Sequence, residues 1–432
     1  MKQANITRQQ GTNFLSAERS QTTKRLRPMA DLSKIMDHEG VINMYNFMFQ
    51  NTTKVYFGEN QLCHLGEELK QYGTRVLLTY GGGSIKKIGL YDKIMEELKK
   101  AELTVFELAG VEPNPRHTTV NKGAEICKKE KIDVLLAVGG GSTIDCTKAI
   151  AAATFHDGDS WDLVMHKAPV TKALSIFTVL TLAATGSEMD AGAVISNIGT
   201  NEKYGLIHPL LQPKVSFLDP ANTYSVSAFQ TVCGAADILS HIFDVSYFVA
   251  AGKMDMVDRV MEAMIKTVVK YAPIAVKEPK NYETRANLMW ASSWALNGFL
   301  QTGRSQAACC HAMEHELSAF YDVTHGLGLA ILTPRWMEYI LDETTAPQFK
   351  KFGVNVFGVD ASLSDMDGAK RAIASLSDFL FKTLGLQRTL TEIGIDDTNF
   401  KAMAKKACGG DLLQGFKPLT PGDVENIFKM CL

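Results

Sequence analysis

Long apolar runs and a charge excess of either sign are missing from this chain of 432 residues. The longest nearly apolar stretch, residues 174–184, contains Ser and Thr and is well short of the ~20 residues that a bilayer span needs. A net charge of -2 gives no basic field for nucleic acid or an anionic membrane surface. The sequence therefore predicts neither a membrane nor a nucleic-acid partner.

Cysteine is sparse, with 8 residues and no CxxC pair, which is too dilute for a disulfide scaffold. Cys309 and Cys310 are adjacent, where a bridge would be strained. No apolar segment follows the first basic residues, so no cleavable signal peptide is expected. These absences predict a protein of a reducing compartment, the cytoplasm.

The composition that is present, 46% hydrophobic and 21% charged residues, is that of an ordinary globular protein and excludes a disordered chain. Residues 1–43 differ from the rest, because they are rich in Gln, Thr and Ser and lack an apolar period. They are predicted to be a flexible extension. A targeting segment is the alternative, since residues 1–30 hold six Lys or Arg and a single acid, Glu18.

Residues 44–220 alternate short β-branched or apolar runs with helical segments, the pattern of a mostly parallel sheet covered on both faces. The expected strands are 54–57, 75–80, 103–108, 133–138, 174–180, 193–198 and 214–218, and the expected helices are 60–72, 85–100, 118–129 and one after residue 142. After Asp219-Pro220 helical periods dominate to the end of the chain. We expect a dinucleotide-binding α/β domain over 44–220 and an all-helical domain over 221–432.

Two glycine clusters follow the expected strands 75–80 and 133–138 and open helices, where backbone N–H groups can face a phosphate. Neither is a GxGxxG motif, and one such turn alone is more often only a turn. Two at neighbouring strand ends predict a dinucleotide cleft. Asp145 lies in the second helix, where it could meet a ribose hydroxyl or serve as a first-turn acid. The residues of the clusters are Gly81, Gly82, Gly83 and Ser84, then Gly139, Gly140, Gly141, Ser142 and Thr143.

Histidines and one aspartate recur at helical spacing in the second half of the chain. Asp237 and His241 are at i, i+4, as are His311 and His315, and His325 follows ten residues later. Imidazoles with one carboxylate can hold Fe²⁺ or Zn²⁺ and leave a position open for a substrate oxygen. Spacing alone makes His315 as good a ligand as the others.

Taken together, these motifs resemble the iron-containing (group III) alcohol dehydrogenases, and within them the branch of butanol dehydrogenases and broad-range aldehyde reductases. The matching stretches are residues 80–87, 139–145, 185–188, Asp237 with His241, and 311–325. The resemblance implies a dehydroquinate-synthase-like fold, with an α/β nucleotide-binding domain and a helical metal-binding domain. It implies the metal ligands Asp237, His241, His311 and His325, and places His315 in the substrate pocket.

The resemblance also implies that Gly139 to Thr143 hold the pyrophosphate, that Asp145 lies on the nicotinamide side, and that Thr181 and Lys203 flank the cofactor. The stretch 181–188 departs from the family pattern at two positions, which leaves Thr181 and Thr185 as hydroxyls and gives less support to contacts from residues 182–184. The implied activity is reversible hydride transfer between a primary alcohol or aldehyde and a nicotinamide cofactor, with His315 as the candidate acid or base and a homodimer as the assembly.

Three other functions stay open at this point. A polyol- or lactaldehyde-type oxidoreductase could use the same scaffold, and a non-catalytic metal-bound protein could retain it. A lyase of the dehydroquinate synthase kind is less favoured, because it needs basic residues near the metal, and Arg304 is the one Lys or Arg between residues 286 and 334.

The first glycine cluster bears on the choice of cofactor. An acid near the adenosine ribose commonly selects NAD(H) and repels a 2′-phosphate. The loop after Tyr80 has no acid before Asp92, and Ser84, Lys86 and Lys87 could meet a phosphate. The sequence therefore favours NADP(H), with NAD(H) possible because small residues do not reject it.

Overall fold

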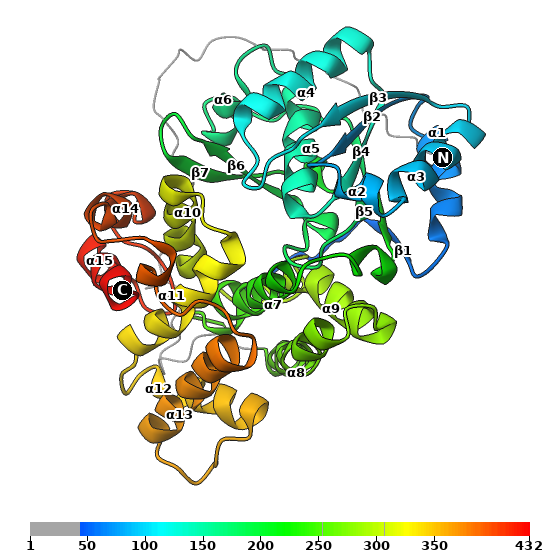
Figure 1. Ribbon diagram of the computed structural model, residues 1–432. Coiled ribbons are helices and arrows are strands. Elements are labelled where there is room, and N and C mark those ends of the chain that lie inside the picture. Colours follow the sequence, from blue (N-terminus) through cyan, green and yellow to red (C-terminus); the bar gives the residue numbers. More distant parts are fainter. Residues whose placement is uncertain (1–43, 253, 306) are drawn as a thin grey trace, which may run out of the picture. The chain divides into compact units, whose positions relative to one another are not determined.

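The computed structural model describes residues 44–252, 254–305 and 307–432, and the predicted extension 1–43 lies outside them. Six parallel strands form the main sheet in the order β1-β8-β5-β4-β2-β3, and two further strands form a separate antiparallel hairpin (Figure 1). The strands are β1 (Lys54–Phe57), β2 (Arg75–Tyr80), β3 (Thr104–Ala109), β4 (Val134–Gly139), β5 (Ser175–Leu180), β6 (Gly192–Asn197), β7 (Glu202–Ile207) and β8 (Val215–Leu218).

Helices cover both faces of the main sheet because its central strands are apolar on both sides. Leu77 and Leu135 pack with residues of α4, α5 and α6 on one face, whereas Leu78 and Leu136 pack with residues of α1 and α3 on the other. The helices of this half are α1 (Leu65–Lys70), α2 (Ser84–Lys87), α3 (Leu90–Lys100), α4 (His117–Glu130), α5 (Gly141–Ala153) and α6 (Ser160–Val164).

Only helices follow Asp219 in the described residues, and they share one large apolar core. Within this core, Phe248 lies against Phe243, Trp336, Phe349 and Phe352. None of the helices in the described residues is long and apolar enough to cross a membrane. The helices are α7 (Ala228–Ile242), α8 (Asp255–Lys277), α9 (Tyr282–Ala295), α10 (Cys309–Tyr321), α11 (His325–Tyr339), α12 (Ala346–Phe352), α13 (Asp365–Asp378), α14 (Phe400–Ala407) and α15 (Pro421–Met430).

The predicted fold class is confirmed, a parallel-sheet N-terminal part and a helical C-terminal part. Two local predictions were wrong. The helix expected over 85–100 is interrupted between α2 and α3, at residues 88–89. The sequence predicted no strand over 202–207, yet β7 pairs with β6 as an antiparallel hairpin beside the main sheet. The polar residues of β7 hide its strand period, and pairing with β6 decides its structure.

Candidate metal and cofactor site

The two glycine loops predicted to bind the cofactor lie side by side at the carboxyl edge of the sheet. β2 ends at Tyr80 and β4 ends at Gly139, and the two strands are hydrogen-bonded neighbours. A third loop approaches closely at Gly141, because a Cβ added there would lie 2.4 Å from Thr185. The structure thus brings together residues 81–84, 139–143 and the chain after β5.

The N-terminus of α5 opens on this edge. Gly140 is extended and caps the helix, and α5 begins at Gly141. The first N–H groups of an α-helix have no partner within the helix and can donate to a phosphate. Thr181 lies beside this loop, since its N–H donates to the carbonyl of Gly139 at 3.0 Å. These residues can hold a dinucleotide pyrophosphate.

The carboxylate of Asp145 accepts hydrogen bonds from other residues of the protein. Its Oδ1 accepts from the Ser187 hydroxyl at 2.5 Å, and its Oδ2 accepts from the Val194 N–H at 2.9 Å. Burial raises the pKa of Asp145 to about 6, although the nearby charge of Lys148 opposes that rise. Asp145 therefore ties the loop containing Ser187 to β6, and its place on the nicotinamide side stays a prediction.

Three of the four residues implied as metal ligands converge in the helical half. Ligand atoms of Asp237, His311 and His325 all lie within 4.8 Å of one another. His241 lies beside them, with its Nδ1 3.6 Å from Asp237 Oδ1 and its ring stacked on that of His311 at a centroid distance of 4.7 Å. Helices α7, α10 and α11 supply all four side chains.

The polar atoms at this place fit a divalent metal ion. Asp237 Oδ1, His241 Nδ1 and His311 Nε2 are buried and have no hydrogen-bond partner in the described part of the chain. Leaving such atoms unsatisfied costs free energy, and a carboxylate with neutral imidazoles is a donor set suited to Fe²⁺ or Zn²⁺.

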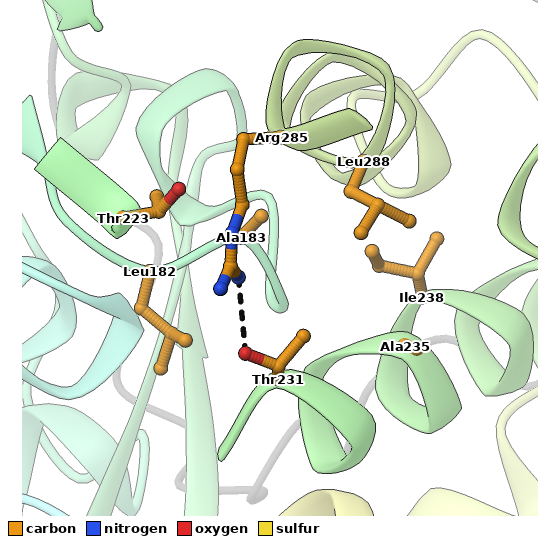
Figure 2. Close-up of a pocket in the computed structure, with 8 residues that line it drawn as sticks. All are labelled: Leu182, Ala183, Thr223, Thr231, Ala235, Ile238, Arg285 and Leu288. Atoms are coloured by element: carbon orange, nitrogen blue, oxygen red, sulfur yellow. Dashed lines mark hydrogen bonds between the residues drawn. The ribbon is translucent and has the colours of Figure 1, made fainter. Parts of the chain in front are cut away.

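The candidate metal site also lies close to the glycine loops. Gly234 precedes Asp237 by three residues in α7 and packs against the carbonyl of Ala183, which follows Thr181 by two residues. Ala183 and Ala235 of α7 line one small cavity, which Figure 2 shows.

A buried carboxylate behind His311 was missed at the sequence level. Asp244 accepts hydrogen bonds from His311 Nδ1 and from the His311 N–H, both at 2.9 Å, and from Cys309 Sγ at 3.2 Å. The bond to Nδ1 fixes the tautomer in which Nε2 carries a free lone pair, the usual arrangement of a metal-binding imidazole. Asp244 follows His241 by three residues, so the i, i+4, i+7 spacing from Asp237 could have marked it as a candidate on the same helical face, although not its pairing with His311.

A second buried carboxylate, Glu314, holds His325. Glu314 hydrogen-bonds His325 Nδ1, and its Oε2 lies 3.4 Å from Lys203 Nζ. Lys203 Nζ is also 3.4 Å from His325 Nδ1, so the hairpin β6–β7 brings this lysine next to the imidazole cluster. Glu314, His315 and His325 form a further cluster of ligand-type atoms. The ammonium of Lys203 would repel a cation there, which favours the Asp237 cluster as the metal site.

His315 lies next to the metal cluster without joining it. Its ring centroid is 5.7 Å from that of His325. Burial first, and the charge of Lys203 second, hold the pKa of His315 well below its usual range. The imidazole is therefore neutral at neutral pH, and its protonated form is disfavoured.

Arg304 does not serve the site. Its Nη2 donates to Asp258 at 2.9 Å and its Nη1 to the Ser246 carbonyl at 2.8 Å. A guanidinium committed to a buried carboxylate is not free to bind a phosphate-bearing substrate, which removes the support for a dehydroquinate-synthase-type lyase.

A glycine-lined dinucleotide edge beside a cluster of imidazoles and a carboxylate defines a metal-dependent, nicotinamide-linked oxidoreductase. The chain belongs to the iron-containing alcohol dehydrogenase family, whose profile matches residues 52–220, and whose C-terminal profile matches residues 231–432. It is an enzyme that interconverts alcohols and aldehydes, of the branch containing butanol dehydrogenases and aldehyde reductases.

The relatives in this branch cover almost the whole described chain. This chain is 49% identical to the NADH-dependent butanol dehydrogenase A of Clostridium acetobutylicum over 388 residues, which are 89% of this chain and 99% of the relative. It is 36% identical to the NADPH-dependent aldehyde reductase of Escherichia coli over 84% of this chain and 93% of the relative. The crystal structure of NADH-dependent butanol dehydrogenase A from Thermotoga maritima superposes with a TM-score of 0.85 at 39% identity, covering 90% of this chain and 99% of that one.

Proposed function

We propose that the enzyme reduces short straight-chain aldehydes such as butanal to primary alcohols, and catalyses the reverse reaction. The observation that carries this proposal is the position of His315, a half-buried neutral imidazole, beside the cluster of Asp237, His311 and His325. The names of the relatives, butanol dehydrogenase and aldehyde reductase, support the same substrate class.

We propose Asp237, His241, His311 and His325 as the ligands of one divalent metal, with Fe²⁺ preferred and Zn²⁺ as the alternative. Such a metal, when bound, polarises the substrate oxygen as a Lewis acid. Asp244 and Glu314 then act on the ligands themselves, because each accepts from the Nδ1 of one imidazole and turns its Nε2 toward the cluster.

His315 and Lys203 are the residues proposed to act on the proton and the cofactor. A bound nicotinamide cofactor supplies or accepts the hydride. His315 is the candidate acid or base that the family resemblance implies, and its lowered pKa means that its protonated form gives up the proton readily, as aldehyde reduction requires. Burial first, and the charge of Lys203 second, keep His315 neutral. Lys203 lies on the hairpin side of the cluster, 3.4 Å from His325 Nδ1, which supports the cofactor-flanking role that the family resemblance implies for it.

We propose that the enzyme uses both NADP(H) and NAD(H), with a modest preference for NADP(H). A Cβ added at Gly82 or Gly83 would meet nothing within 4 Å, so the loop has room for a 2′-phosphate beside Ser84. Lys86 contributes less than its position in the sequence suggests. Its ammonium lies 4.4 Å from the centroid of the Tyr91 ring, and that ring's hydroxyl donates to Glu107 at 2.7 Å.

A homodimer is proposed from the surface at the β1 edge of the sheet. Phe57 and Trp290 are 37% and 41% exposed and touch edge to face at 5.5 Å, and Phe47 and Met48 are 51% and 82% exposed nearby in sequence. An open strand edge with exposed aromatic side chains is a surface that a second copy can cover. Sedimentation of Trp290→Glu against the wild type tests this, and an unchanged molecular mass would contradict it.

The proposal includes a cytoplasmic location and a domain boundary near residue 220. All 8 cysteines are free thiols, which suits a reducing compartment. The family profiles divide between residues 220 and 231, and every described strand precedes that division, which supports the boundary.

The decisive experiment assays the purified full chain, loaded with Fe²⁺ or with Zn²⁺, against aldehydes from ethanal to octanal with NADPH and with NADH. We expect the highest kcat/KM near butanal and a ratio of NADPH to NADH between one and about ten. Glyceraldehyde and lactaldehyde are the comparison substrates, and higher kcat/KM for either would favour the polyol-type function. A tenfold advantage of NADH would overturn the proposed cofactor preference.

A further inference from the structure

A carboxylate lies beside the first glycine loop although the loop itself contains no acid. Glu107 belongs to β3, the last strand in the order of the main sheet, and is paired in register with Leu78 of β2. Its Oε2 accepts from the Tyr80 hydroxyl and its Oε1 from the Tyr91 hydroxyl, both at 2.7 Å. Tyr80 is the residue before Gly81, so Glu107 is joined to the start of the loop.

The carboxylate of Glu107 is charged at neutral pH. Partial burial acts to raise its pKa, but the hydrogen bonds from Tyr80 and Tyr91, together with the charge of Lys86, hold that pKa below its usual range. Glu107 therefore adds one full negative charge to the side of the loop on which the two tyrosine hydroxyls lie.

Lys86, a basic residue that follows the loop, is held by these same rings. Its Nζ lies 4.4 Å from the centroid of the Tyr91 ring and 5.1 Å from that of the Tyr80 ring. The two rings touch edge to face at 5.9 Å. A cation over an aromatic face is attracted by the ring quadrupole, and the nearby charge of Glu107 adds to that attraction. The ammonium is thus drawn toward β2 and β3.

The loop before Lys86 also faces the second glycine loop. A Cβ added at Gly81 would lie 3.3 Å from the Val111 carbonyl and 3.9 Å from Thr143 Oγ1, so Gly81 lies between the turn after β3 and the proposed pyrophosphate loop. A charge at this place acts on NADP(H) more than on NAD(H), because only NADP(H) carries a 2′-phosphate on its adenosine ribose.

We propose that Glu107 limits how strongly the enzyme prefers NADP(H), by holding Lys86 on the two tyrosine rings instead of leaving its ammonium to bind the 2′-phosphate. This inference rests on the proposed function, in which residues 81–84 lie at the adenosine ribose. Glu107 is a positioning residue, since it acts through Lys86. In this arrangement a loop followed by two lysines gives only the modest preference proposed above.

The first test measures the ratio of kcat/KM with NADPH to kcat/KM with NADH, for the metal-loaded full chain acting on butanal. Glu107→Gln is expected to raise this ratio about two- to fivefold through a lower KM for NADPH, the factor that corresponds to a surface cation–π contact. Glu97→Gln is the matched control, because it removes the same charge from a carboxylate that accepts from Lys100 at 2.8 Å, six residues after Tyr91 in α3. The control is expected to keep the wild-type ratio.

The second test is a double-variant cycle that isolates the part of Lys86. Lys86→Met is expected to lower the ratio more in Glu107→Gln than in the wild type, because the freed ammonium reaches the phosphate. Both side chains are exposed, so these variants leave the buried core intact. Equal lowering in the two backgrounds, or an unchanged ratio in Glu107→Gln, would overturn the proposal.

The wild-type ratio tests the proposed function separately. A tenfold advantage of NADH in the wild type would overturn the proposed cofactor preference. A rise of the ratio in Glu107→Gln, removed again by Lys86→Met, would support the role of Glu107 in that case as well.

Discussion

Replacing Asp244 by Asn is expected to weaken metal binding without replacing any of the proposed metal ligands. The carboxylate accepts from His311 Nδ1, from the His311 N–H and from Cys309 Sγ. The amide of Asn keeps one oxygen acceptor and presents an NH₂ group to the remaining donors. The His311 ring can satisfy that NH₂ group by moving its proton to Nε2, which removes the lone pair that faces the cluster.

The size of the effect follows from the lost bonds. A hydrogen bond to a charged group contributes about 1.5–3 kcal/mol. Loss of one such bond on the Nδ1 side corresponds to a roughly 10- to 100-fold weaker metal affinity, the range known for such supporting carboxylates. We therefore expect the Kd for Zn²⁺ of Asp244→Asn to rise by about 10- to 100-fold, measured by titrating apoprotein in competition with a chelator.

The matched control is Asp258→Asn. Asp258 is also buried in the helical half, where it accepts from Arg304 at 2.9 Å and from Lys351 at 2.8 Å. This variant is expected to unfold at lower denaturant and to bind zinc as the wild type does. A folded Asp244→Asn protein with wild-type zinc affinity would refute the positioning role of Asp244.

Three further outcomes are expected. His325→Ala should lose both bound metal and turnover, and full metal occupancy with a normal rate would exclude His325 as a ligand. His315→Ala should lower kcat or raise KM while elemental analysis finds the metal retained, and metal loss as complete as in His325→Ala would make His315 a ligand. Glu188 is fully buried, which raises its pKa to about 7. The folded state therefore binds this proton more tightly than the unfolded state, so the free energy of unfolding falls as pH rises from about 4.5 to 7, by on the order of 3 kcal/mol. Glu188→Gln should flatten that slope in urea titrations at pH values across this window, and an unchanged slope would contradict the assignment.

The sequence by itself determined the class of fold and most of the elements. Buried strands such as 134–139 are continuous apolar runs, and a parallel strand covered on both faces requires such a run. The glycine clusters could be recognised from the sequence because a neighbouring side chain packs so closely on residues such as Gly141 that only glycine fits there. The i, i+4 spacing of Asp237 and His241 likewise follows from the helical period alone.

Only the tertiary structure shows which carboxylates hydrogen-bond to the candidate ligands. Local spacing cannot show that Asp244 meets His311, because the two are 67 residues apart and come together only through helix packing. Lys203 reaches Glu314 across 111 residues, on a hairpin whose polar strand β7 has no readable period. Helical and strand periods can be read from the sequence because they depend on neighbouring residues. Pairings between distant polar groups depend on how the helices and strands pack.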